Sequence, residues 1–233
     1  MTALEDAGLE ICDVLLWLFG TGFPKGRTLK PAWQPIVLAR RSGPARCLNI
    51  DACRIQSPVL PTDRRASPRG TKTFWGTPGK VRAGDRHDAR GRRPANLVVG
   101  HGPECAGGCC AGCPVRSLGA GTGPARFFYC PKPAGREIEG NGHPTRKPLA
   151  LDTHLARLIL SPSLREGEKR LLVPYCGSGS EMVAGFEAGW EYVCGIENAE
   201  EWLRVAGGRL SRTMREQPAV RKLITEVNVM EAQ

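Results

Sequence analysis

The 233-residue sequence predicts an α/β fold, in which helices pack on a largely parallel sheet. Short apolar segments alternate with helical patterns in the C-terminal half, and a glycine turn at residues 177–179 separates one such segment from a helix. Hydrophobic residues make up 41% of the chain, enough for a substantial core. Gly and Pro number 29 and 19, so we also expect long irregular connections.

Apolar segments bounded by turn residues predict the strands. They are expected at residues 13–18, 36–39, 96–99, 127–129, 170–173 and 192–196. Helical spacing of apolar residues predicts helices at residues 149–160, 181–188 and 200–213. Residues 170–213 thus form a βαβα unit, whose two strands should be parallel because crossover connections are right-handed. We expect a further strand or helix after residue 217.

The turn at residues 174–179 follows a predicted strand, and the next predicted strand ends at Glu197, about twenty residues further on. Glycines in such a turn let the backbone approach a ligand, and an acid at the second strand end suits ribose hydroxyls. Ligands bind beyond the carboxyl ends of parallel strands, so the turn and Glu197 are expected around one crevice. The alternative is an ordinary βαβ unit, with Glu197 simply exposed at a strand end.

An H-P-T-x-K-P-L segment at residues 143–149 precedes a predicted helix and then the P-Y-x-G-S-G turn. This order resembles the β-class amino-group DNA methyltransferases, which methylate adenine N6 or cytosine N4. Segments at 13–25, 29–40, 91–97 and 126–130 are similar to those of phage and prophage enzymes, so the resemblance covers most of residues 1–214. It implies a Rossmann-like S-adenosylmethionine-dependent methyltransferase sheet with a long basic, Gly/Pro-rich insertion.

The resemblance also implies an S-adenosylmethionine pocket. The matching residues are His143, Thr145, Lys147, Pro174, Tyr175, Gly177, Ser178, Gly179 and Glu197. Glu197 would take the ribose hydroxyls, and residues 143–148 would close the amino-acid end. Val173 departs from the family, which usually has an acidic or amide residue there, so one polar contact to the cofactor is expected to be missing.

The family's catalytic tetrapeptide, D/N/S-P-P-Y/F/W, occurs nowhere in this sequence. It normally frees the lone pair of the target amine and holds the flipped base. Residues 1–10 resemble the helix end and strand start that follow it, so we expect no catalytic residue here. The expectation is a shortened, split or degenerate enzyme with weak or no activity alone, and a separate polypeptide carrying the catalytic loop is an expected partner.

Three regions follow from the resemblance. Residues 1–56 are the remainder of the catalytic-side half, residues 57–125 a basic Gly/Pro/Cys-rich insertion for target recognition, and residues 126–233 the cofactor-binding half.

The net charge of +10 favours a polyanionic partner, because basic side chains release counterions from phosphates. Residues 64–93 hold ten Lys or Arg against two acids, a net charge of +8. Pro and Gly interrupt this segment, so we expect a mobile loop that contacts double-stranded DNA. Its DNA-binding candidates are Arg64, Arg65, Arg69, Lys72, Arg82, Arg92 and Arg93. The alternative is a solvated insertion without a partner.

Ten cysteines in a chain expected to be cytoplasmic favour metal ligands over a disulfide framework. The spacing His101-x3-Cys105-x3-Cys109-x3-Cys113 places three thiolates and an imidazole close enough for a tetrahedral zinc site. Two alternatives stay open: a glycine-rich loop with reduced thiols, or a C-x2-C half-site formed by Cys110 and Cys113.

The sequence contains no run of eighteen apolar residues, and Glu5, Asp6 and Glu10 stand where a signal peptide would be basic. We therefore expect a cytoplasmic protein with no membrane partner. Three functions stay open: a DNA amino-methyltransferase that needs a missing N-terminal part, a catalytically inactive DNA-binding or regulatory relative, and a methyltransferase of RNA or protein.

Overall fold

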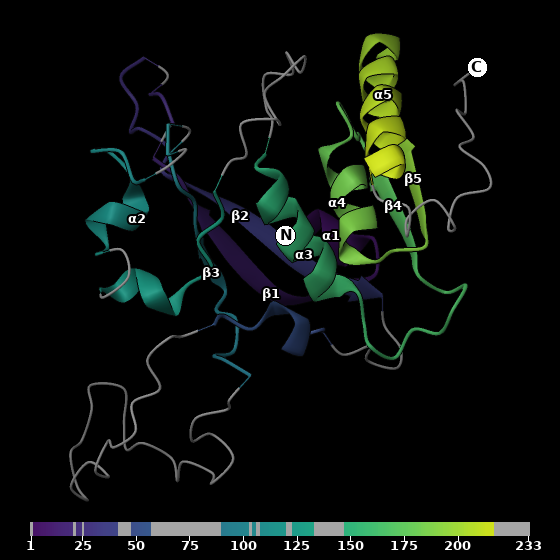
Figure 1. Ribbon diagram of the computed structural model, residues 1–233, viewed down its shortest axis with the longest axis horizontal. Coiled ribbons are helices and arrows are strands. Elements are labelled where there is room, and N and C mark those ends of the chain that lie inside the picture. Colours follow the sequence, from purple (N-terminus) through teal and green to yellow (C-terminus); the bar gives the residue numbers. More distant parts are fainter. Residues whose placement is uncertain are drawn as a thin grey trace, which may run out of the picture.

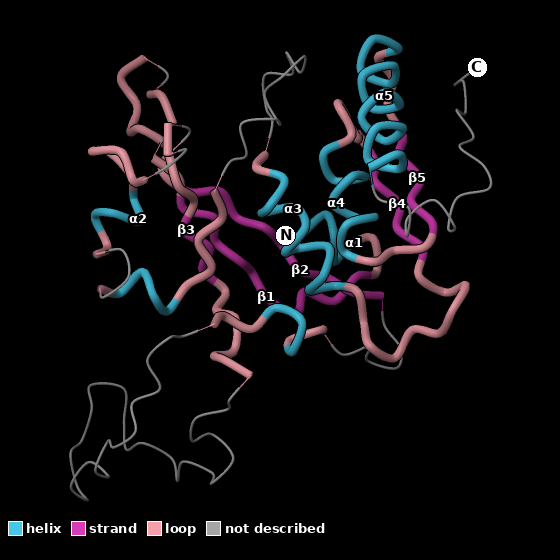
Figure 2. The backbone as a smooth tube through the Cα atoms, in the orientation of Figure 1, coloured by secondary structure: helices cyan, strands magenta, loops and turns pink. Residues whose placement is uncertain are grey.

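The structure is a computed structural model that describes residues 2–20, 22–24, 26–41, 48–56, 90–102, 104–105, 108–119, 123–132 and 147–216. Two sheets lie beside each other in it, with helices packed between and against them (Figures 1 and 2). The predicted element after residue 217 lies outside the described residues, and so do residues 57–89, which include most of the basic segment 64–93.

The first sheet has the strand order β2-β1-β3. A short helix, α1 (Thr2–Asp6), leads into β1 (Leu9–Leu18). β1 pairs antiparallel with β2 (Trp33–Arg41) and parallel with β3 (Leu97–Val99). The predicted strands at 13–18, 36–39 and 96–99 are therefore confirmed.

The second sheet belongs to a βαβα unit that matches the prediction. The elements of this unit are β4 (Arg170–Pro174), α4 (Ser180–Ala188), β5 (Tyr192–Ile196) and α5 (Glu200–Glu216). Helix α3 (Leu149–Ile159) precedes it in the chain. β4 and β5 are parallel, with Arg170 opposite Tyr192 and Pro174 opposite Ile196. The carboxyl ends of both strands therefore meet at one edge, as predicted.

Helix α4 packs directly on the strands of this second sheet. A Cβ at Gly185 would lie 2.7 Å from Leu171 Cδ2, so the absence of a side chain there lets the helix approach the sheet. Apolar residues of the turn, α4 and α5 form the enclosed core, consisting of Cys176, Met182, Val183, Phe186 and Leu210.

Helix α3 connects the two sheets. Its Leu158 belongs to a buried cluster with Leu15 of β1 and Cys53 of a short 3-10 helix, η1 (Asp51–Cys53). On its other side, the Ala156 carbonyl accepts a 3.0 Å hydrogen bond from Trp190 Nε1, just after α4. Figure 1 shows α3 in this position, between the first sheet and α4.

The predicted strand at 127–129 is mostly wrong. Residues Pro124–Phe127 form a 3-10 helix, η3, and only Tyr129 makes a bridge, parallel to Val98. Pro124 explains the difference, because its fixed φ is suited to the first position of a helix and it has no amide hydrogen for a sheet. No helix among the described residues combines the length and apolarity needed to cross a membrane.

Candidate functional site

The turn after β4 has an unusual backbone. Tyr175, Gly177 and Gly179 have φ values of 56°, 49° and 76°, all in the left-handed region. For Tyr175 this conformation costs roughly 1–2 kcal/mol, because its Cβ crowds the following carbonyl. The Tyr175 side chain is 90% exposed, so burial does not compensate for this cost. Strain of this kind gathers at functional sites and points to a role for the turn.

Glu197 joins the end of β5 to this turn. Its Oε2 accepts a 2.9 Å hydrogen bond from the Gly177 amide. Its Oε1 accepts from the amides of Asn198 and Ala199, at 3.0 and 3.1 Å. The structure therefore brings the predicted turn and the predicted acid together, and Glu197 also braces the turn.

Arg209 of α5 also binds this turn through hydrogen bonds. Its Nη1 donates to the Ser178 carbonyl at 2.7 Å and to the hydroxyls of Ser178 and Ser180 at 3.2 and 2.9 Å. Ser178 is only 4% exposed. Both its hydroxyl and its carbonyl are therefore engaged by α5, and Ser178 holds the turn in place. Sequence reasoning missed Arg209, because no motif distinguishes it from the other arginines of α5.

Gly179 allows α5 to come close enough for these bonds. A Cβ at position 179 would lie 2.8 Å from the Cβ of Ala206, closer than side chains approach. Gly179 also precedes the first residue of α4 and has a positive φ. Both requirements select glycine at this position.

Lys147 approaches the site from the segment before α3. Its Nζ lies 3.1 Å from Oε1 of Glu181, in the first turn of α4. Partial burial is the largest single influence on the pKa of Lys147 and lowers it, but the charge of Glu181, its hydrogen bond and the charge of Asp152 together outweigh burial, so the pKa is raised. Pro174 is exposed, and Val173 packs against the core. The other two predicted cofactor residues, His143 and Thr145, lie outside the described residues.

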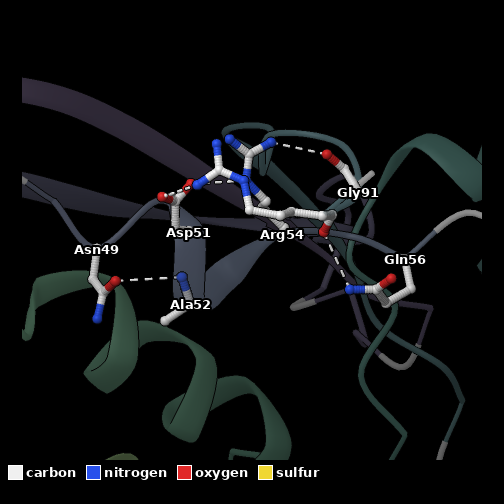
Figure 3. Close-up of polar contacts among 7 residues, drawn as sticks. Asn49, Asp51, Ala52, Arg54, Gln56 and Gly91 are labelled. Carbon is white, nitrogen blue, oxygen red and sulfur yellow. Dashed lines mark hydrogen bonds and ion pairs between the residues drawn. The ribbon is translucent and has the colours of Figure 1, made fainter. Parts of the chain in front are cut away.

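A polar clasp holds together the two ends of the segment that contains residues 57–89 (Figure 3). Ile55 and Arg92 exchange two backbone hydrogen bonds of 2.9 Å. Asp51 binds Arg54 at 2.8 Å and Arg90 at 2.6 Å. Hydrogen bonding to Arg54 is the main reason why the pKa of Asp51 is lowered.

Gly91 lets the two ends of this clasp approach. Its φ is 103°, and a Cβ there would lie 2.7 Å from the Ile55 carbonyl oxygen. The Gly91 carbonyl also accepts a 2.8 Å hydrogen bond from Arg54 Nη1. The basic segment therefore leaves and rejoins the fold at one point.

Two of the predicted DNA-binding residues lie beside this clasp. Arg93 is exposed, and the Arg92 guanidinium lies 4.5 Å from the centre of the Phe127 ring. Arg126 lies 4.4 Å from the same ring, so two cations flank one aromatic side chain. The remaining predicted residues, Arg64, Arg65, Arg69, Lys72 and Arg82, lie outside the described residues.

Three of the four predicted metal ligands come together. The ligand atoms of His101, Cys109 and Cys113 all lie within 4.8 Å of one another. Cys105, the fourth, is not in that group, and its Sγ lies 3.4 Å from Cys110 Sγ. Partial burial is the main reason why the pKa of His101 is lowered, which favours the neutral imidazole that binds metals.

Among known proteins, this chain is similar to solved structures only. No family model matches this chain, and no curated protein matches it. Among the solved structures that match is the crystal structure of the M1.HpyAVI–SAM complex. The two chains are 16% identical with a TM-score of 0.44, and the match covers 89% of this chain and 66% of that chain.

Proposed function

We propose that this chain is the cofactor-binding and DNA-binding part of an S-adenosylmethionine-dependent DNA methyltransferase that acts on adenine N6 or cytosine N4. The observation that carries the proposal is the hydrogen bond from the Gly177 amide to Glu197 Oε2. It places a glycine turn and a carboxylate at the shared carboxyl edge of two parallel strands, where nucleotide-type ligands bind.

The residues around this edge fit the cofactor. Gly177 and Gly179 have no side chain that would block a ligand from the turn, and Glu197 is an acid at the end of the second strand, the position that suits ribose hydroxyls. Tyr175 offers an exposed ring, and Lys147 is paired with Glu181 in the first turn of the helix that follows the glycine turn. When bound, S-adenosylmethionine supplies the methyl group from its sulfonium. The protein's own residues hold and orient it.

Double-stranded DNA is the proposed substrate. Two observations support this proposal. Residues 64–93 carry a net charge of +8, and the clasp holds the two ends of this part of the chain together. Arg92, Arg93 and Arg126 add cations beside the clasp, where phosphates would be bound.

A separate polypeptide is proposed to supply the catalytic loop. The sequence contains no D/N/S-P-P-Y/F/W tetrapeptide. Within the described part of the chain, β4 pairs only with β5, so its other edge is available to a further strand. Leu172 and Ile196 are 57% and 56% exposed on the face of these strands opposite to α4, which supports an apolar partner surface on that face.

The proposal is tested in two steps with the purified 233-residue chain. Equilibrium dialysis with labelled S-adenosylmethionine should show saturable binding, and a folded chain that binds none would refute the proposal. Labelled methyl transfer to unmethylated duplex DNA should then be undetectable. Transfer by the chain alone would show that it contains its own catalytic group and would refute the proposed second polypeptide.

A second candidate is a DNA-binding or regulatory protein that has lost methyl transfer. Val173 favours it, because an apolar side chain that packs on the core stands where the resembled family has a polar one. This candidate predicts salt-dependent DNA binding without binding of S-adenosylmethionine, so the dialysis experiment distinguishes the two.

A further inference from the structure

Cysteines crowd one small part of the molecule, the connection from β3 to α2 (Pro114–Ser117) and η3. The buried residues of this cluster are Val99, Cys105, Cys113, Val115 and Ala125. None is larger than valine, and Cys105 and Cys113 are fully enclosed. Side chains of this size bury little apolar surface and therefore stabilise the unit only weakly. Small units of this kind commonly depend on a disulfide or a metal ion.

The spacing between ligand atoms matches a metal centre. His101 Nδ1 lies 3.5 Å from Cys113 Sγ and 3.6 Å from Cys109 Sγ. In a tetrahedral zinc site, Zn–N and Zn–S bonds of usual length place the nitrogen and each sulfur about 3.6 Å apart. Both distances agree with that value.

Hydrogen bonding alone does not explain this geometry. A neutral imidazole nitrogen is either one donor or one acceptor, so Nδ1 can serve only one of the two thiols well. Nδ1 lies at nearly equal distances from the sulfurs of Cys109 and Cys113. A single metal ion placed between the three atoms could therefore bind all of them. Two sulfurs and an imidazole are ligands that suit zinc.

Cys105 and Cys110 are the candidates for the fourth ligand. Cys105 is fully buried, and its Sγ accepts a 3.3 Å hydrogen bond from the Cys110 amide. A backbone amide that donates to a sulfur supports a thiolate and orients it, as outer contacts do in metal sites. Cys110 is partly exposed, and no such contact to its Sγ is present among the described residues.

We propose that His101, Cys109 and Cys113, with Cys105 as the fourth ligand, bind a structural zinc ion that joins the end of β3 to the start of α2. This site stands apart from the glycine turn and does not depend on the proposed methyltransferase function. Because all four positions are filled by protein, the ion stabilises the fold and has no open position for catalysis. Closing the site requires Cys105 Sγ to move toward the other three ligands.

The direct test is the metal content of the full chain, purified under reducing conditions without added chelator. We expect about one zinc ion per chain, and Co²⁺ in place of zinc should give the visible absorption bands of tetrahedral thiolate coordination. Removal of the metal should lower the melting temperature of the protein. A chain with no zinc that also gives no such bands when Co²⁺ is added would overturn the proposal.

Variants identify the ligands. Cys109→Ser and Cys105→Ser should each reduce bound zinc at least about tenfold, and Cys110→Ser should keep it. Cys12→Ser is the matched control, because Cys12 is an exposed thiol on β1. Loss of zinc in Cys110→Ser with retention in Cys105→Ser would overturn the assignment of the fourth ligand. Co²⁺ titration of the native chain serves as a test that does not depend on whether a variant folds.

Discussion

Arg209 on α5 donates a 2.7 Å hydrogen bond to the carbonyl of Ser178 in the turn after β4. Glu197 binds the Gly177 amide of the same turn from the end of β5. The turn is therefore fixed by a cation on one side and a carboxylate on the other. Such bracing explains how a strained Tyr175 can be maintained before any ligand arrives.

Arg209→Met should loosen the turn. It removes charged hydrogen bonds to Ser178 and Ser180, each worth about 1.5–3 kcal/mol. We expect the free energy of unfolding to fall by about 2–4 kcal/mol and binding of S-adenosylmethionine to weaken about tenfold or more. Arg212→Met is the control, since Arg212 is exposed on the same helix. Equal losses in both variants would contradict the role of Arg209.

Glu197→Gln should weaken cofactor binding more than it weakens the fold. Glutamine keeps one acceptor oxygen but turns an NH₂ group toward amides that donate. We expect a decrease of roughly 10- to 100-fold in affinity for S-adenosylmethionine, measured by equilibrium dialysis, and a loss of about 1–3 kcal/mol in stability. Glu200→Gln should change neither, because Glu200 is 78% exposed in a surface pair with Arg204. An unchanged affinity in Glu197→Gln would show that Glu197 does not contribute to cofactor binding.

Two glycines should respond to alanine in opposite directions. Gly179→Ala places a Cβ against Ala206 in a left-handed backbone and should destabilise the protein by about 2–4 kcal/mol. Gly208→Ala, at an open position of α5, should stabilise it by about 0.5–1 kcal/mol. Urea unfolding measures both. If Gly179→Ala leaves the free energy of unfolding unchanged, α5 does not pack on the turn as described.

The sequence could predict the βαβα unit because its signals are local. Apolar periodicity and the G-S-G turn lie within one stretch of chain, and the handedness of crossovers determines the strand direction. The position of α3 between two sheets depends instead on distant pairs such as Leu158 with Leu15, which no short pattern encodes. Likewise, the rotation of α5 decides that Arg209 rather than Arg212 reaches the turn, and the even spacing of the cysteines could not show that the Cys105 thiol would lie outside the group of the other three ligand atoms.

Asp51→Asn tests whether the clasp matters for DNA binding. The substitution removes a negative charge, so electrostatics alone would tighten the binding of a polyanion. It also breaks the pairs with Arg54 and Arg90 that hold the ends of the basic segment together. We expect the second effect to dominate and the affinity for duplex DNA to fall several-fold, as measured by fluorescence anisotropy at fixed salt.

Glu104→Gln provides the control for charge, because Glu104 is exposed and lies outside the clasp. This variant should bind DNA as tightly as the unmodified chain or slightly more tightly. If Asp51→Asn behaves in the same way, the clasp does not position the segment for DNA.

His154 should make stability depend on pH. Its ring stacks on Tyr129 with centroids 4.1 Å apart, and burial, assisted by the charge of Arg157, lowers its pKa from 6.5 to about 4. Above pH 6.5 the imidazole is neutral in both states. Between pH 6.5 and 4 the unfolded chain binds a proton that the folded chain does not, so stability falls as the pH falls.

The loss assigned to His154 is roughly 3 kcal/mol over that interval, at about 1.4 kcal/mol per pH unit. His154→Phe keeps a ring against Tyr129 but cannot titrate, so its stability should fall less between pH 7 and pH 4. Carboxylates titrate in both proteins and cancel when the two unfolding free energies are subtracted. Urea unfolding at several pH values measures this difference, and a difference that is constant with pH would show that His154 is protonated as easily in the folded protein as in the unfolded one.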